Sequence, residues 1–283
     1  MTKSTVYGPV ASWRLSRSLG IDMLCTEQKI CNFDCVYCQL GPTTKPQTER
    51  QEFVSLTKLS EDLTAAKGVA ADWVTFSGMG EPTLAANLGA AITTVKSILG
   101  LPVAVFTNGS LINRQDVRSE LGLADMVIVK MDAPDETLFQ SINRPVDGIE
   151  MSSILQGLQL FRFEYKGKLA LDIMLSDVNK GKGYKLQMNA RFALPDQVQL
   201  NTPLRPCEIK PLPAAELEIF RKNWFWDRNT LTVYAAKRPE VSPIDVEETE
   251  RRHPTKPKTE PAQAQLTATG QVNEAQPQPS QSG

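Results

Sequence analysis

Histidine and long apolar runs are scarce in this chain, and each shortage excludes a class of protein. The 283 residues contain one histidine, His253, in a segment that we expect to be disordered. A folded part without histidine has no Ser–His or Cys–His nucleophile and no histidine general base. The longest apolar stretch, about residues 84–106, is interrupted by polar residues and by Pro102, so it cannot span a membrane.

Signals of secretion and of polyanion binding are also scarce. The first nine residues contain no apolar segment like that of a signal peptide, and five cysteines, three of them clustered, do not form a disulfide framework. These features predict a protein of the reducing cytoplasm. The net charge of −1 argues against a general binder of polyanions. Residues 162–191 nevertheless carry seven basic and three acidic side chains, either as a solvated surface or as a contact for phosphates.

Three of the cysteines, Cys31, Cys35 and Cys38, lie within eight residues in the pattern CxxxCxxC. Thiolates this close cannot all pair as disulfides, but they can hold one metal centre. A cubane iron–sulfur cluster normally takes four cysteines, so three leave one iron without a protein ligand. An open coordination position is where a metal site carries out chemistry. The alternatives are a zinc site, which would need a fourth Cys or His nearby, and plain structural cysteines; we favour the open cluster.

This spacing, with Tyr37 just before the last cysteine, resembles the cluster loop of the radical S-adenosylmethionine (SAM) superfamily. The resemblance implies a [4Fe–4S] cluster on the three cysteines, with the amino and carboxylate groups of SAM on the open iron. An electron donor such as flavodoxin or ferredoxin would reduce the cluster. SAM is then cleaved to a 5′-deoxyadenosyl radical, which abstracts a hydrogen from the substrate. We therefore expect an enzyme whose cofactors carry the chemistry while the protein positions and shields them.

The rest of the chain alternates short apolar runs with helical patterns, which indicates βα units and a parallel sheet. Helices are expected over residues 88–99 and from an Asn113 cap to about Gly122. A helical region with a turn at Arg144-Pro145 is expected from Asp135 to about Tyr165. Periodicity alone does not separate a barrel from an open doubly wound sheet, but the resemblance implies a partial (β/α)6 barrel of the TIM type. Six strands are expected, at residues 20–24, 73–77, 102–106, 126–129, 169–175 and 197–201.

Glycine and polar residues follow several expected strands, where ligands bind in parallel α/β folds. Residues 78–82, Gly-Met-Gly-Glu-Pro, resemble the superfamily motif in which exposed backbone and a carboxylate hold the ammonium of SAM. Glycine lets the backbone approach a ligand, and the Glu81 carboxylate can pair with an ammonium. An ordinary strand-to-helix turn is the alternative. The expected cofactor-binding residues are Tyr37, Gly78, Met79, Gly80, Glu81, Asn108 and Asp132.

Three of the polar residues have a local alternative to ligand binding. Asn108 and Ser110 close the third strand and Asp132 closes the fourth, where they suit a ribose hydroxyl or the substrate, or else a cap or turn. Tyr37 would lie against the adenine or shield the cluster, or else pack in the core. No adenine-contact motif is evident in residues 171–175, and no catalytic side chain can be named.

The composition changes near the C-terminus. Pro, Gln, Thr, Glu and Lys dominate after residue 238, and a segment of this kind cannot bury enough apolar surface to order itself. We therefore divide the chain into a core at residues 1–212, a short extension at 213–238 and a disordered tail at 239–283. The extension contains Trp224, Phe225 and Trp226, which would support a protein interface if exposed.

Further segments resemble the radical SAM proteins similar to the tRNA wyosine-base synthases, which build a tricyclic guanine from methylguanosine and pyruvate. The resemblance covers about residues 7–212 and implies a tRNA base as substrate. True wyosine synthases carry three more cysteines upstream, whereas here only Cys25 precedes the motif, which argues against that specific reaction. The alternatives are an enzyme that installs a radical on a partner protein and a non-enzymatic electron-transfer protein. The segments are residues 7–10, 14–22, 35–41, 76–84, 142–145 and 198–203.

Overall fold

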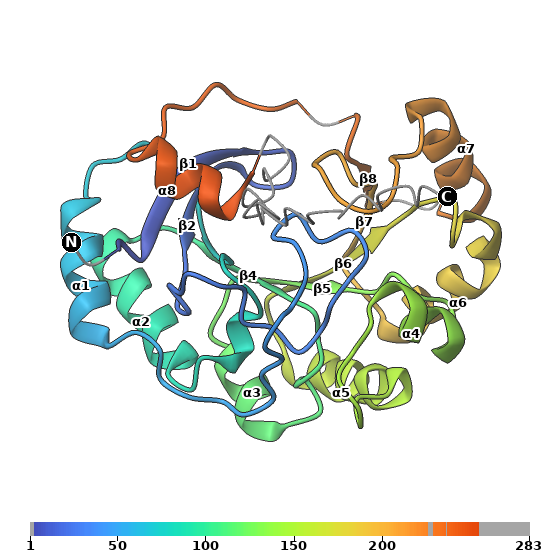
Figure 1. Ribbon diagram of the computed structural model, residues 1–283, viewed down its shortest axis with the longest axis horizontal. Helices are drawn as coiled ribbons and strands as arrows, with labels where there is room; N and C mark the ends of the chain where they lie inside the picture. Colours follow the sequence, from blue (N-terminus) through green and yellow to red (C-terminus); the bar gives the residue numbers. More distant parts are fainter. Residues whose placement is uncertain (1–2, 226–228, 236, 255–283) are drawn as a thin grey trace, which may run out of the picture.

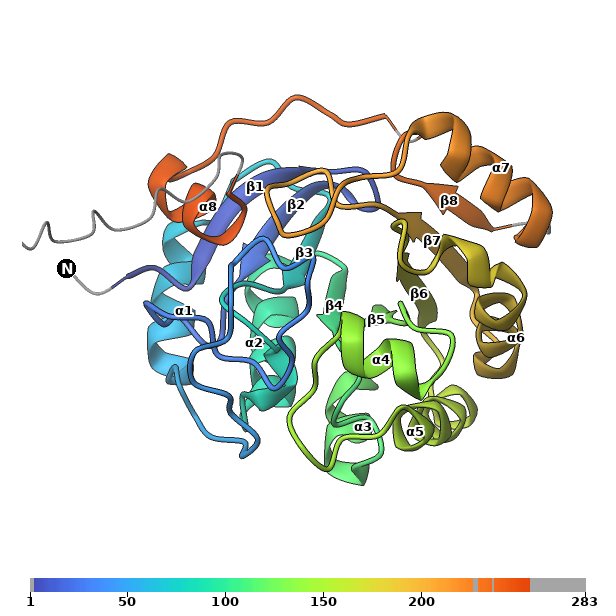
Figure 2. The same cartoon turned by 45° about the vertical axis from the view of Figure 1, so that its right-hand side comes forward.

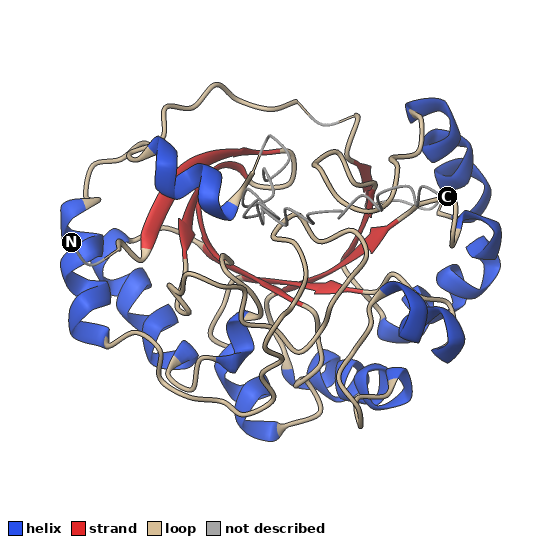
Figure 3. Ribbon diagram, viewed as in Figure 1, coloured by secondary structure: helices blue, strands red, loops and turns tan. Residues whose placement is uncertain are grey.

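The computed structural model describes residues 3–225, 229–235 and 237–254. Within them, eight strands form one sheet in chain order, and the sheet is curled into a half-barrel with helices on its convex side (Figures 1 and 3). The first two strands are antiparallel and the other neighbours are parallel. The strands are β1 (Val6–Ser12), β2 (Ser16–Ile21), β3 (Trp73–Phe76), β4 (Val103–Thr107), β5 (Met126–Lys130), β6 (Lys168–Met174), β7 (Gln197–Asn201) and β8 (Thr230–Thr232).

Helices follow the parallel strands and cover the outer face of the sheet (Figure 2). The outward residues of the central strands are β-branched or leucine and are fully buried against these helices, which forms the main core. No described helix is long and apolar enough to cross a membrane. The α-helices are α1 (Leu56–Ala65), α2 (Leu88–Leu99), α3 (Gln115–Leu121), α4 (Glu136–Ile142), α5 (Met151–Glu164), α6 (Gly183–Ala193), α7 (Ala214–Trp224) and α8 (Val246–Arg252).

The sequence predicted the middle of this sheet but not its edges. The six expected strands correspond to β2 through β7, and α2 has the predicted bounds because Gly100, at φ 65°, ends it in the left-handed conformation. The first expected strand begins earlier than predicted, at Ser16, and pairs with β1 in a hairpin. The helical region expected from Asp135 to Tyr165, with its turn at Arg144-Pro145, is confirmed as α4 and α5, whereas Arg114 rather than Asn113 stands at the N-cap of α3.

The prediction of a disordered tail from residue 239 is wrong for its first part. The segment after β8 crosses the open side of the half-barrel, and α8 then packs on β1 (Figures 1 and 2). Asp245 caps α8 by accepting from the Glu248 N–H, and the Arg252 side chain is completely buried. Residues 255–283 of the expected tail lie outside the described residues.

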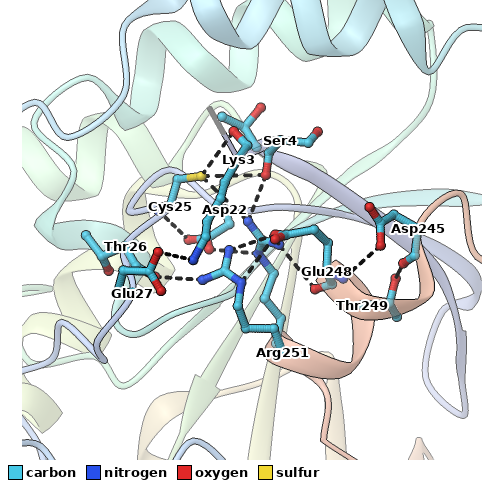
Figure 4. A network of polar contacts seen from close by, with 12 residues as sticks. Lys3, Ser4, Asp22, Cys25, Thr26, Glu27, Asp245, Glu248, Thr249 and Arg251 are labelled. Carbon is cyan, nitrogen blue, oxygen red and sulfur yellow. Dashed lines mark hydrogen bonds and ion pairs between the residues drawn. The ribbon is translucent and has the colours of Figure 1, made fainter. Parts of the chain in front are cut away.

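Ion pairs and hydrogen bonds join α8 to the start of the chain (Figure 4). The Arg252 Nε lies 2.8 Å from Asp22 Oδ2, and its Nη2 donates to the Ser4 carbonyl at 2.8 Å. His253 contacts the Tyr7 ring and lies against Arg205. The folded part therefore contains the one histidine, contrary to expectation. Its partner Arg205 also donates to Gln39, the residue after Cys38.

Candidate cluster and SAM site

The three motif cysteines lie in the loop that follows β2. Cys31 is buried, Cys35 and Cys38 are half-buried, and all three thiols are free. Burial raises the pKa of Cys35 to about 11 and also raises the pKa of Cys31. Metal binding would therefore have to displace their protons. Among the described residues, no three Cys, His, Asp or Glu side chains, the three motif cysteines included, are already placed around one point as the ligands of a single metal ion.

Two glycines bring the Gly-Met-Gly-Glu segment against this loop. The Ile30 N–H donates to the Met79 carbonyl at 2.8 Å, and the Glu81 N–H donates to the Ile30 carbonyl at 3.0 Å. Gly80 has a φ of 148°, and a Cβ there would lie 1.6 Å from the Ile30 oxygen. Gly78 has a φ of 146°, and its Cβ would lie 2.4 Å from Asp22 Cγ. Both positions therefore require glycine, and the two segments are held as one unit.

The Glu81 side chain is buried beneath this unit and fixes it. Its Oε1 accepts from the Thr83 N–H, the Thr83 hydroxyl and the Thr107 hydroxyl, and its Oε2 accepts from the Asn108 N–H at 2.7 Å. Burial raises the pKa of the carboxyl group, and the Asn108 N–H opposes that rise. These bonds tie the end of β3 to the end of β4. The carboxylate thus has a structural task of its own beside the ammonium contact expected from the sequence.

Asn108 and Ser110 belong to a closed set of hydrogen bonds with the cluster loop. The Asn108 Nδ2 donates to Asn32 Oδ1 at 2.8 Å and lies 3.7 Å from the Cys31 sulfur. The Asn32 amide donates in turn to the Ser110 hydroxyl at 2.8 Å, and Asn108 Oδ1 accepts from the Ser110 N–H. The end of β4 is therefore joined to the residue beside Cys31, a long-range contact that the sequence did not indicate. The bond from the Ser110 N–H to Asn108 Oδ1 is the local turn role that the sequence left open.

Tyr37 and Asp132 meet at the other side of the loop. The Tyr37 hydroxyl donates to Asp132 Oδ2, and the Lys130 ammonium lies 4.7 Å from the centre of the Tyr37 ring. Asp132 Oδ1 accepts from the Met174 N–H at 2.7 Å. Burial, followed by the Asp132 charge, raises the pKa of Tyr37 well above its usual value, so the phenol stays a neutral donor. A small hollow beside these groups is lined by Asn108, Asp132 and Asn143.

Sequence reasoning missed two residues of the loop's surroundings. The Asn143 Nδ2 lies 3.6 Å from the Cys35 sulfur. The Ile-Asn-Arg-Pro motif contains this residue and resembles the wyosine-synthase group, but the sequence did not indicate what the residue contacts. Lys29 is 6% exposed, and its ammonium donates to the Gly41 carbonyl at 3.1 Å. The Lys29 ammonium places a positive charge beside the thiols. In the sequence, only the position of Lys29 two residues before Cys31 could have indicated this role.

The concave face of the sheet carries charge inside the half-barrel. Side chains of one strand alternate between the two faces, and Arg14 reaches inward from the β1–β2 turn. Its Nη2 lies 2.7 Å from Asp172 Oδ1, and its Nε donates to Gln199 Oε1 at 2.7 Å. Lys130 donates to Asp172 Oδ2 at 3.0 Å. Two of these contacts join residues more than 150 positions apart, so no local pattern in the chain indicates them.

The basic stretch at residues 162–191 does not present its whole charge to solvent. Arg162 pairs with Asp196 at 2.9 Å, Lys180 with Glu216 at 2.8 Å and Lys185 with Asp135 at 3.0 Å. These three carboxylates lie outside the stretch, so they lower its net charge. The exposure that a protein interface at residues 224–226 would need is not met at Phe225, which is 3% exposed, and Trp226 lies outside the described residues.

Comparison with known proteins identifies the class. The family model of the radical SAM superfamily matches residues 28–168. The UPF0026 protein slr1464 of Synechocystis is 42% identical over 77% of this chain and 80% of that protein. GTP 3′,8-cyclase of Actinobacillus pleuropneumoniae is 32% identical over 48% of this chain and 39% of the cyclase. The chain therefore belongs to the radical SAM superfamily and, within it, to the group of UPF0026 proteins.

Solved structures of the superfamily share the fold. Streptococcus suis SuiB bound to S-adenosylmethionine matches with a TM-score of 0.57 and 15% identity, over 73% of this chain and 48% of SuiB. Archaeal TYW1 matches with a TM-score of 0.51 and 19% identity, over 76% of this chain and 72% of TYW1. The chain thus spans about half the length of SuiB. It is a radical SAM enzyme, whose cofactors are a [4Fe–4S] cluster and SAM.

Proposed function

We propose that Cys31, Cys35 and Cys38 hold the cluster and that the Gly78–Glu81 segment receives the methionyl end of SAM. The observation that carries the proposal is the backbone pairing between Ile30 and the Gly-Met-Gly-Glu segment, beside three free thiols. Three thiols of one loop suit a cubane with an open iron. When bound, the cluster and SAM supply the 5′-deoxyadenosyl radical.

The chain's own residues would then bind, orient and shield. Gly78 and Gly80 let the segment pack directly against Asp22 and Ile30, while buried Glu81 fixes the loop beneath it. Asn108 and Asp132, expected near the ribose, stand beside Cys31 and Tyr37 respectively. Lys29 offers a positive charge to the thiolates once they ligate. The loop also shields the thiols from solvent, more so for buried Cys31 than for half-buried Cys35 and Cys38.

The test of the site is cluster assembly on the purified full chain. Anaerobic reconstitution should give about four irons per chain, and Cys35→Ala should remove them, whereas Cys25→Ala should keep them as a matched control. Reduced holoprotein should convert SAM to 5′-deoxyadenosine. Tight zinc without iron, or full iron on Cys35→Ala, would contradict the site.

We further propose that the substrate is a base in tRNA. The name of GTP 3′,8-cyclase gives that relative a purine nucleotide as substrate, and the interior of the half-barrel offers both donors and acceptors through Arg14, Lys130, Asp172 and Gln199. Such a mixed set suits the polar edge of a base. A radical on a partner protein draws no support from the extension, because Phe225 is buried, and the SAM-binding segment argues against mere electron transfer.

The substrate test compares modified nucleosides in tRNA from strains with and without the gene. Loss of one modified nucleoside on deletion, and its return with the intact gene but not with Cys35→Ala, would support the proposal. If residues 162–191 contact phosphates, neutralising Lys180, Lys182 and Lys185 should flatten the salt dependence of tRNA binding by roughly one unit for each phosphate that is no longer bound. An unchanged nucleoside profile together with salt-independent binding would exclude tRNA.

A further inference from the structure

The Ile-Asn-Arg-Pro segment after α4 runs alongside the cluster loop. Val36 donates its N–H to the Ile142 carbonyl at 3.0 Å, and Asp34 donates to the Asn143 carbonyl at 3.1 Å. The Val146 N–H donates back to the Asn32 carbonyl at 3.0 Å. These bonds have the pattern of a short antiparallel pair. The backbone between Cys31 and Cys35 is therefore held by a segment more than 100 residues away in sequence.

The Asn143 side chain points from this segment to three acceptors. It is 3% exposed, and its Nδ2 lies 3.0 Å from Asp132 Oδ2, 3.0 Å from the Tyr37 oxygen and 3.6 Å from the Cys35 sulfur. The Tyr37 proton is already donated to Asp132. The phenol oxygen and the carboxylate thus both accept, which fixes the amide with its nitrogen toward the sulfur.

We propose that Asn143 is a positioning residue that raises the reduction potential of the cluster through its N–H on the Cys35 sulfur. This inference rests on the proposed function, in which Cys35 is a ligand. One-electron reduction by an external donor makes the cluster more negative, and a donor to a ligating sulfur stabilises that state. Asn108 stands in the same relation to Cys31, at 3.7 Å, so two of the three thiols carry an amide donor.

The test measures the potential of the reconstituted full chain by EPR-monitored redox titration. Asn143→Leu removes the donor at similar volume. We compare the two proteins at the potential where half of the natural protein's cluster is reduced. There the ratio of reduced to oxidised cluster in Asn143→Leu should be about tenfold lower, which corresponds to a midpoint about 59 mV more negative for a one-electron couple. Asn143→Gln keeps an amide donor and should shift the midpoint less. Iron content should stay at about four per chain.

Asn179 provides the matched control. Its Nδ2 is fully buried and donates to the Asp132 and Met174 carbonyls, each at 2.8 Å, without a contact to sulfur. Asn179→Leu should leave the midpoint unchanged even where it lowers stability. If Asn143→Leu does not assemble a cluster, the same redox titration is carried out on Asn143→Ser, which has a smaller side chain.

The outcomes separate this inference from the proposed function. An unchanged midpoint in Asn143→Leu or Asn143→Ser with full iron, or an equal shift in Asn179→Leu, would overturn the role of Asn143 and leave the cluster site intact. Full iron on Cys35→Ala would instead overturn the cluster site itself. A more negative midpoint in the Asn143 variants alone supports the proposal.

Discussion

Replacing Arg252 with methionine should destabilise the protein strongly, although the residue lies in a segment whose composition resembles a disordered tail. The Arg252 side chain is completely buried, and its partner Asp22 is 1% exposed. Methionine fills similar space but leaves the Asp22 carboxylate without its cation. Breaking a buried pair in this way costs about 3–5 kcal/mol. Two backbone N–H groups, from Leu24 and Cys25, remain on Asp22 Oδ1, so we expect the lower part of this range.

The effect should reach the SAM site, because the Asp22 side chain occupies the space beside Gly78. The assay is urea unfolding of the cluster-free protein, followed by equilibrium SAM binding to reconstituted protein. Arg251→Met is the comparison variant. Arg251 is 17% exposed, pairs with Glu248 on the same helix and donates to the Thr26 carbonyl at 2.7 Å, so its loss leaves no fully buried charge unpaired and should cost less than the loss of Arg252. Truncation after residue 254 should leave stability unchanged.

Truncation after residue 238 is a second form of the same perturbation. It removes α8 with Arg252 and should lower both stability and SAM affinity, whereas composition alone predicts that it has no effect. An Arg252→Met protein with a stability close to that of the natural chain, or a fully active chain truncated after residue 238, would refute the reasoning that α8 holds Asp22 in place.

Three other perturbations should report on the site and on α8. Gly80→Ala should abolish SAM binding while iron is retained, because its Cβ would meet the Ile30 oxygen; normal binding would contradict this. Glu81→Ala leaves the donors around the carboxylate unpaired, which should cost about 1–3 kcal/mol in unfolding free energy and weaken SAM binding, with Glu81→Gln losing less. The pKa of His253 is held well below its usual value by burial, then by Arg205 and Arg252. Stability should therefore be complete above about pH 6.5 and fall below it, where the unfolded chain takes up the proton more readily; His253→Gln should flatten that dependence, and an unchanged profile would count against it.

Local sequence determined the parts of this protein that depend on neighbouring residues. The spacing of Cys31, Cys35 and Cys38 places three thiols in one short loop whatever the rest of the chain does. The apolar period of α2 and the glycine after it set both ends of that helix. The two glycines of the Gly-Met-Gly-Glu segment indicated a close approach of the backbone to a ligand, and the structure shows close approaches of that backbone to Asp22 and Ile30. These features predicted the superfamily and its cofactors.

Only the tertiary structure decided the residues that surround the loop. Asn143 meets Cys35 across 108 positions, Arg14 meets Asp172 across 158 and Arg252 meets Asp22 across 230. Such contacts depend on the order and curl of the strands, which no local pattern encodes. Helix α8 shows the same limit, since its seven residues are mostly charged and have no apolar stripe. It is held by a buried ion pair whose partner lies at the other end of the chain.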